Sequence, residues 1–303
     1  MASERVAHSH SESHALHILL ASLIDYAGLF PPSGLEMKHA VANYARYREG
    51  EHAWALGRFI VPAARLEEFE LLLPKARSGA GWHISALLGP DVAADMAAIA
   101  QFNSRHTGRA QIDSVETKAA TPDEIAILRR AISDSVLTYF EIPHTDDPAA
   151  LLAAIHKARA RAKIRTGGLT PEVFPTAEQI ARFILRCIVA EVPFKATAGL
   201  HHPLRCVRPL TYAPDAPTGK MHGFINVFMA AAFALSGMPE PALVELLQEE
   251  SPSAFRFDAT GASWRDHRID QRLLLECRGS LGMSFGSCSF DEPIDDLHAI
   301  NLL

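Results

Sequence analysis

The sequence predicts an α/β fold of the (β/α)8 TIM-barrel class, and three observations favour it. Short apolar strands alternate with amphipathic helices seven times over about 200 residues, which indicates a parallel sheet with right-handed crossovers. Strand after strand ends in polar residues, as expected where a barrel gathers its active site at the carboxyl ends of its strands. A doubly wound open sheet fits the same alternation, but the early Gly-x-Gly-x-x-Gly turn typical of many such sheets is absent.

The first five strands and their helices follow from apolar runs that end in polar residues or glycine. After a flexible leader containing several histidines, residues 1–18, we expect one barrel domain over 19–303. Strands are expected at 19–28, 58–62, 82–89, 111–118 and 137–143, and helices at about 36–50, 64–76 and 91–104, then from 121 and from near 147. The helix after 121 opens with Thr121-Pro-Asp-Glu124, a capping box with proline in the first turn.

The sixth and seventh strands, within 162–168 and 193–199, each carry a lysine and end in a glycine turn. A helix over 176–189 connects them, and an insertion over about 203–220 follows. The helix over 222–236 is apolar on most faces, so we expect it to be buried against the barrel or across the interface of a homo-oligomer. Residues 254–258 and 282–286 compete for the eighth strand, with a hairpin near 253–268, and a last helix begins near 291.

Composition narrows the classes of function. The formal net charge of -6 and the absence of a basic stripe argue against a nucleic-acid partner. No apolar run approaches the roughly 18 residues of a membrane span, so no membrane partner is expected. The cysteines, Cys187, Cys206, Cys277 and Cys288, lack paired spacing and no signal peptide is evident, so we expect a reducing cytoplasm.

Lys163 and Lys195 supply the strongest chemical indication in the chain. Lysine is among the residues least often found fully buried without a partner. Here two lysines lie one strand–helix unit apart, each four residues before a glycine. Burial and a second nearby cation both lower the pKa of an amine, which makes it able to form a Schiff base with a carbonyl compound. We therefore expect a site in which one amine stays uncharged.

Alternation along the strands gathers further charges with these lysines. If the strand-end residues face inward, the barrel mouth collects Glu116, Lys118, Glu141, Lys163, Arg165 and Lys195. Glu116, Glu141 and His202 are then candidates for proton transfer. The alternative interpretations are a structural ion-pair network, or side chains that point outward beneath the helices.

The two lysine segments resemble those of deoxyribose-phosphate aldolases. Lys163-Ile-Arg-Thr166-Gly167 is similar to their Lys-Thr-Ser-Thr-Gly element on strand six, and Lys195-Ala-Thr-Ala-Gly199 to Lys-Ala/Pro-x-Gly-Gly on strand seven. Gln111-Ile-Asp113-Ser-Val is similar to their Glu-Ile-Asp-Met-Val strand. The likeness covers about 110–200. It implies a (β/α)8 class I aldolase with Lys163 as the Schiff-base residue and Lys195 as the cation that depresses its pKa.

Departures from this pattern bear on the substrate. Arg165 replaces a small residue and adds a cation able to clamp a carboxylate or phosphate, while the short Gly-rich phosphate turn after strand seven is missing. We expect a small anionic carbonyl metabolite, with recognition of phosphate or carboxylate left open. The expected substrate-binding residues are Asp25, Arg165, Thr166, Gly167, Thr197, Gly199, His201 and Ser287.

Adjacent histidines define a rival interpretation. His201 and His202, with Glu141 across the barrel, would bind a divalent metal, and the chain would then be a metal-dependent lyase or hydrolase. A third interpretation is a barrel that binds a small anion without turnover. The leading expectation is a lyase that cleaves or forms a C–C bond through a lysine imine, with no cofactor.

Overall fold

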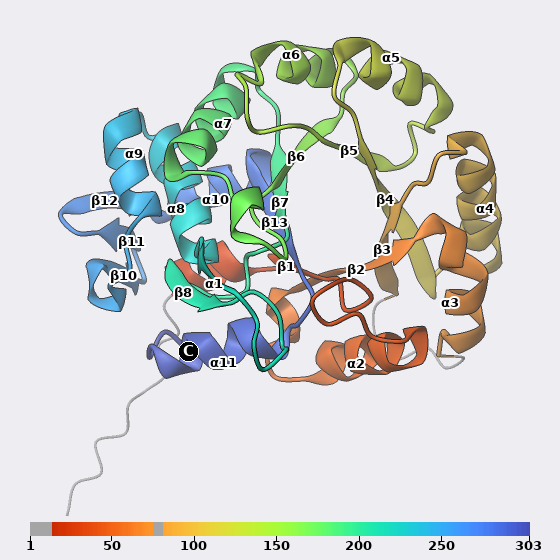
Figure 1. The fold of residues 1–303 in the computed structure, drawn as a ribbon, viewed down its shortest axis with the longest axis horizontal. Helices are drawn as coiled ribbons and strands as arrows, with labels where there is room; N and C mark the ends of the chain where they lie inside the picture. The colour runs from red at the N-terminus through yellow and green to blue at the C-terminus, as the bar shows by residue number, and fades with distance from the viewer. Residues whose placement is uncertain (1–13, 75–80) are drawn as a thin grey trace, which may run out of the picture.

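The computed structural model describes residues 14–74 and 81–303 and confirms the expected fold class. Eight parallel strands close into a barrel with the order β1-β13-β7-β6-β5-β4-β3-β2, and helices form a ring outside it (Figure 1). The barrel strands are β1 (Ile24–Tyr26), β2 (Leu56–Pro62), β3 (Trp82–Leu87), β4 (Ala110–Lys118), β5 (Leu137–Glu141), β6 (Arg161–Arg165), β7 (Phe194–Thr197) and β13 (Gly282–Ser287).

The helices follow the expected segments closely where capping signals are strong. Thr121 accepts a hydrogen bond from the backbone of Glu124, and Thr176 and Gln179 form a reciprocal capping box. The α-helices are α1 (His14–Leu20), α2 (Met37–Glu49), α3 (Leu66–Leu72), α4 (Val92–Arg105), α5 (Pro122–Ala131), α6 (Ala149–Lys157), α7 (Ala177–Val189), α8 (Phe224–Leu235), α9 (Glu240–Leu247), α10 (Gln271–Ser280) and α11 (Asp291–Ala299). Short 3-10 turns, η1 (Ala53–Ala55), η2 (Ala63–Arg65), η3 (Pro171–Val173) and η4 (Pro252–Ala254), complete the connections.

The expectation for the amino-terminal region was wrong in two respects. Residues 14–18, assigned to the leader, belong to α1, where Leu16 and Leu19 are buried and the helix packs against α10. The strand expected over 19–28 is shortened to β1, because Leu19 and Leu20 belong to this helix. A short apolar run fits a buried helix as well as a strand, and here the helix is formed. The rest of the predicted leader lies outside the described residues.

Two small sheets are added to the barrel. The insertion after β7 forms the hairpin of β8 (Cys206–Pro209) and β9 (Thr218–Met221). β10 (Phe255–Asp258), β11 (Gly261–Trp264) and β12 (His267–Asp270) form an antiparallel sheet beside α9 and α10, outside the helical ring (Figure 1). Residues 254–258 are therefore not the eighth barrel strand. That place is taken by 282–287, where Ser284 and Gly286 face the barrel interior and Gly282 lets Phe228 of α8 pack closely against the strand.

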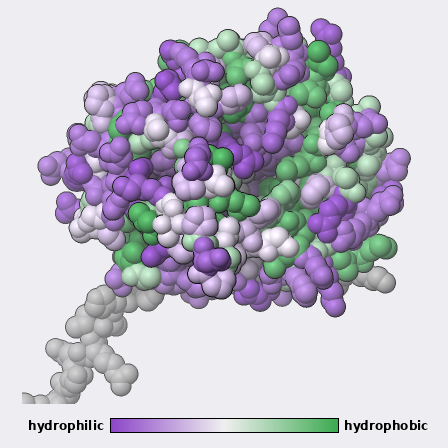
Figure 2. Space-filling view, viewed as in Figure 1, coloured by the Kyte–Doolittle hydropathy of each residue, from purple (hydrophilic) through white to green (hydrophobic). Residues whose placement is uncertain are grey.

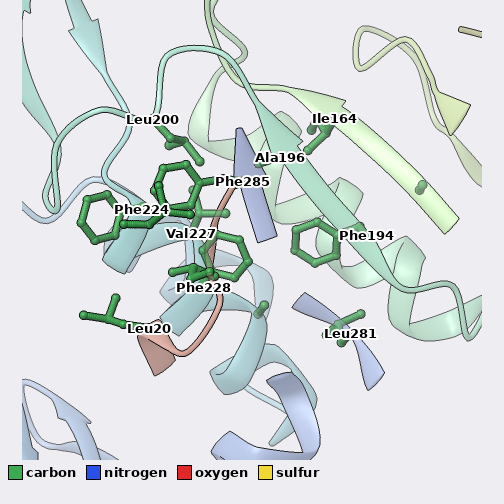
Figure 3. Close-up of a cluster of buried hydrophobic side chains, with 14 of the residues drawn as sticks. Leu20, Ile164, Phe194, Ala196, Leu200, Phe224, Val227, Phe228, Leu281 and Phe285 are labelled. Atoms are coloured by element: carbon green, nitrogen blue, oxygen red, sulfur yellow. The ribbon is translucent and has the colours of Figure 1, made fainter. Parts of the chain in front are cut away.

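A cluster of aromatic side chains supports the lysine strands from outside the barrel (Figure 3). Phe194 of β7 stacks on Phe228 of α8 with ring centroids 6.2 Å apart, and Phe224 stacks on Phe285 of β13 at 5.1 Å. Helix α8 is buried by α7, α9, α10 and β13 of the same chain, so a subunit interface is not needed to cover it. Truncating one such phenylalanine typically costs about 3–5 kcal/mol of stability. This cluster fixes β7 and β13, and with them the polar residues on their inner faces.

Hydrophilic residues cover most of the face seen in Figure 2, and hydrophobic residues show between them. Among the helices of the described chain, none combines the length and the apolar composition required to cross a membrane.

Candidate active site

Strand register places the two lysines next to each other. Lys163 pairs with Lys195 across β6 and β7, and Glu141 of β5 pairs with Lys163. Because side chains alternate across a strand, Ile164 and Ala196 join the outer core while both lysines point into the barrel. Lys163 is 4% exposed and Lys195 is 1% exposed. The inward orientation of the two amines follows directly from this register.

Glu116 separates the two ammonium groups. One of its carboxylate oxygens lies 2.8 Å from Lys163 Nζ and the other lies 2.7 Å from Lys195 Nζ. A carboxylate oxygen of Asp25 also lies 2.7 Å from Lys195 Nζ, and one of Glu141 lies 2.9 Å from Lys163 Nζ. Each lysine therefore contacts two carboxylates. The site is an ion-pair chain that runs from the barrel interior towards its mouth.

The two carboxylates beside Lys195 determine its charge. Burial lowers the pKa of Lys195, but the charges of Asp25 and Glu116 outweigh burial and raise that pKa above its ordinary value. Burial likewise raises the pKa of Glu116, and the two lysines outweigh it and hold that pKa well below its usual range. Asp25 and Glu116 therefore favour the charged form of Lys195. The proposed effect of this cation on Lys163 stays a prediction.

Several polar groups that the sequence-based reasoning missed hold the carboxylates in place. Ser85 donates a hydrogen bond of 2.8 Å to Glu116, and Ser284 donates one of 2.7 Å to Asp25. The backbone N–H of Arg58 donates to the other Asp25 oxygen at 2.7 Å. In the sequence, the signal for these donors was a serine on the inward face of a mostly apolar strand, Ser85 in β3 and Ser284 in β13. Such a residue needs a polar partner inside the barrel.

The carboxyl ends of the strands surround a cavity of about 530 Å³. Its wall includes Glu116, Glu141, Lys163 and Lys195 from the ion-pair chain, and apolar residues such as Ile60 and Leu210. This volume and this mixture of apolar wall and convergent polar groups are typical of sites for small molecules. The reactive groups of any ligand in this cavity would lie beside the lysine–carboxylate chain.

Four of the predicted substrate-binding residues line this cavity. They are Arg165, Thr197, Gly199 and His201. The Arg165 side chain is 40% exposed and its Nε lies 3.1 Å from Glu141, so part of its guanidinium remains open to a ligand. Lys118 also lines the cavity, which gives the mouth a second cation.

The other predicted binding residues have structural roles and do not face the cavity. Asp25 lies beneath the cavity, where it holds Lys195. Thr166 is buried and donates to the carbonyl of Ala198 at 2.5 Å. Gly167 and Gly199 bring two loop backbones together, so a Cβ on Gly167 would meet Gly199 Cα at 2.9 Å. Ser287 is fully buried. None of Asp25, Thr166, Gly167 and Ser287 lines the cavity wall.

The predicted metal ligands do not converge. His202 Nδ1 lies 2.5 Å from Asp296, outside the cavity wall, so its expected role in proton transfer was also wrong. His201 Nδ1 lies 3.3 Å from Glu292, while Glu141 binds Lys163 and Arg165. Within residues 14–74 and 81–303, no group of three or more His, Cys, Asp or Glu side chains is arranged to hold a metal ion. Consecutive histidines in this loop turn towards different partners.

Asp113, on the strand that resembles the aldolase segment, lies away from the lysines. Its carboxylate binds Arg58 at 2.7 Å and His83 at 2.9 Å, and all three line a different pocket. Glu116, three residues further along β4, supplies the carboxylate that meets both lysines.

Comparisons with known proteins give no relative from which to draw a role. No protein-family model, curated protein or solved structure matches this chain. The fold is one that many unrelated enzymes share, so the function must be argued from the site.

Proposed function

We propose that this protein is a lyase of the class I aldolase type, which cleaves or forms a C–C bond through an imine on Lys163. The observation that carries the proposal is the position of Lys163. Its amine lies at the cavity wall between two carboxylates, at the carboxyl ends of the barrel strands where such enzymes place their chemistry. Lys195 also reaches the cavity wall but is more deeply buried, at 1% exposed against 4% for Lys163.

The charge balance of the site suits an iminium ion. Among the described residues, the chain joins three cations, Lys163, Lys195 and Arg165, to three carboxylates, Asp25, Glu116 and Glu141. A protonated imine on Lys163 carries the same single charge as the ammonium group that it replaces. Its formation therefore leaves no buried charge unpaired, which would be costly.

Glu141 is placed to move the protons of this reaction. In the proposed sequence it accepts a proton from the Lys163 ammonium group, 2.9 Å away, and the free amine then adds to the substrate carbonyl. Return of that proton to the carbinolamine oxygen releases water and leaves the iminium ion. Glu141 next removes the proton of the β-hydroxyl, the C–C bond breaks, and its electron pair passes to the iminium nitrogen as an enamine. Protonation of the enamine carbon and hydrolysis restore Lys163.

Lys195 acts in this scheme as a positioning residue. Its ammonium group holds one oxygen of Glu116, so that the other oxygen stays directed at Lys163. The buried Lys195 also keeps the pKa of Glu116 low, which keeps this carboxylate charged beside the iminium ion.

The mouth of the cavity favours an anionic substrate. Arg165 and Lys118 both line it, and Arg165 retains donors beyond its contact with Glu141. We propose a small carbonyl compound that carries a carboxylate or phosphate group, bound with its carbonyl carbon near Lys163. No contact in the described residues favours metal-dependent chemistry over this scheme.

Borohydride trapping tests the proposal. Purified protein is mixed with a panel of small aldehydes, ketoacids and phosphorylated carbonyl compounds and reduced with sodium borohydride. The mass of the intact protein is then measured by mass spectrometry. At least one compound is expected to leave a covalent adduct of the mass of a reduced imine. Lys163→Arg keeps the charge but removes the nucleophilic amine, so it should give no adduct. A full panel without any adduct on the unsubstituted protein, or an undiminished adduct on Lys163→Arg, would overturn the proposal.

A further inference from the structure

A second group of reactive side chains lines the same cavity, on the side of β13. Cys288 follows this strand and lines the wall together with His201. Its Sγ lies 3.8 Å from His201 Nδ1, and the same nitrogen lies 3.3 Å from a carboxylate oxygen of Glu292. His201 comes from the loop after β7, whereas Cys288 and Glu292 both come from the junction of β13 and α11. The thiol and the carboxylate contact the same ring nitrogen of His201, so Glu292 favours the charged imidazole, and a charged imidazole beside a thiol activates a cysteine as a nucleophile.

The environment of Cys288 differs from that of the other cysteines. Burial alone would raise the pKa of the Cys288 thiol, but the hydrogen bond and the charge of His201 outweigh burial and lower that pKa. Burial raises the pKa of Cys206 to about 11 and that of Cys277 to about 11, and it raises that of Cys187 well above its ordinary value. The chain therefore contains internal controls for the reactivity of Cys288.

The imidazole is held as a cation by its two partners. Burial lowers the pKa of His201, but the contacts with Cys288 and Glu292 outweigh it and raise that pKa to about 9. The hydroxyl of Tyr212 lies 3.9 Å from the Cys288 sulfur and 3.5 Å from Glu292, and Tyr26 also interacts with the thiol electrostatically. These groups surround the Cys288–His201 pair.

We propose that Cys288 is a nucleophilic thiolate that bonds a small aldehyde in this cavity, with His201 as the proton donor and Glu292 holding the imidazole. A sulfur lone pair forms the S–C bond, and the π pair of the carbonyl moves to its oxygen. That oxygen takes a proton from His201, which leaves a neutral hemithioacetal and a neutral imidazole. The reverse steps release the aldehyde. This reaction needs neither an oxidant nor a free amine, so it is independent of the imine on Lys163.

Alkylation by iodoacetamide at neutral pH tests the thiolate. Peptide mapping after short exposure of the folded protein should find Cys288 modified before the half-buried Cys206. His201→Gln should slow the alkylation of Cys288 by about tenfold or more, because the thiol loses the cation that lowers its pKa. Lys163→Arg should leave the rate unchanged, which separates this result from the imine proposal. Equal rates at Cys288 and Cys206, or no effect of His201→Gln in a folded variant, would overturn the inference.

Competition with glycolaldehyde tests the bond itself. In the Lys163→Arg variant, where no imine forms at that position, glycolaldehyde should slow the alkylation of Cys288 reversibly and leave that of Cys206 unaffected. Acetamide, similar in size but far less electrophilic, serves as the matched control and should have no effect. Equal protection by acetamide, or no protection by glycolaldehyde, would contradict hemithioacetal formation.

Discussion

The two ends of the ion-pair chain differ in how far solvent reaches them. At the inner end, the side chains of Asp25 and Lys195 are 1% and 2% exposed, and serine and backbone donors satisfy Asp25 further. At the outer end, Glu141 is 11% exposed and Arg165 is 40% exposed. Lys163 lies between them at 5%. The inner end, with Asp25 and Lys195, is therefore almost inaccessible to solvent, and the outer end, with Glu141 and Arg165, is partly exposed. Both ends are built from acidic and basic side chains.

This difference explains why two similar lysines receive different roles. Lys195 is almost fully buried between Asp25 and Glu116, so it mainly stabilises the charges around it. Lys163 shares Glu116 but lies beside the more exposed Glu141, with which it can exchange a proton as it meets a ligand. The predictions below test this division, from the largest expected effect to the smallest.

Lys195→Met is expected to produce the largest loss of stability. It would leave Asp25 without a cationic partner and Glu116 with Lys163 alone, and breaking a buried pair in this way costs about 3–5 kcal/mol. Urea unfolding measures the change. Lys163→Met should cost clearly less, because Glu116 keeps Lys195 and Glu141 keeps Arg165. Equal losses for the two substitutions would erase the distinction between the inner and outer halves.

Acid should destabilise the protein partly through Glu116 and Glu141. The pKa of each is lowered in the folded state, from an unfolded value of about 4.3. Their contribution to stability is therefore complete above about pH 4.3 and is lost as the pH falls through the lower, folded-state values. Urea unfolding at a series of acidic pH values should show a shallower decline for Glu116→Gln than for the unsubstituted chain. Parallel curves would show that Glu116 is not held ionised by the lysines.

Ser284→Ala should have a moderate effect on stability. It removes the hydroxyl that donates to Asp25, and hydrogen bonds to charged groups contribute about 1.5–3 kcal/mol. Ser85→Ala is the matched substitution at Glu116, on the opposite side of the chain of ion pairs. Both losses are measurable as shifts of the urea midpoint. Variants as stable as the original would mean that these serines do not support the carboxylates.

Arg165→Ala should have the smallest effect on stability and a larger one on substrate binding. Its ion pair with Glu141 is partly exposed, and such pairs contribute about 0–1 kcal/mol. If Arg165 binds the anionic group of the substrate, more compound is needed for half-maximal borohydride trapping. Lys118→Ala provides the comparison for the second cation at the mouth. Trapping that is unchanged in both variants would remove anion recognition from the proposal.

The sequence was sufficient for the barrel and for which residues share a strand face with each lysine, but it left open whether those faces point inward. Alternation within a strand is a local property, so it predicts which side chains lie on the same face. It does not predict which distant carboxylate reaches a lysine. Asp25 is 170 residues from Lys195 along the chain, and its strand was obscured by the apolar residues of α1. Glu116 was expected at the barrel mouth from alternation along its strand, and it is the β4 carboxylate that contacts both lysines.

The reactivity of Cys288 could not be predicted from local sequence for the same reason. Its histidine partner lies 87 residues away, and no basic residue stands next to it in the chain. The adjacent histidines at 201 and 202 suggested a metal site, but each one faces a different acidic residue of α11. Neighbours in sequence were separated in space, and distant residues were brought together.

The position of the trapped adduct tests the division between the two lysines most directly. After borohydride reduction with a reactive carbonyl compound, peptide mapping assigns the modified residue. The account predicts modification of Lys163 while Lys195 remains unmodified, because Lys195 is more deeply buried and Asp25 and Glu116 favour its charged form. Modification of Lys195, or of both lysines to the same extent, would contradict it.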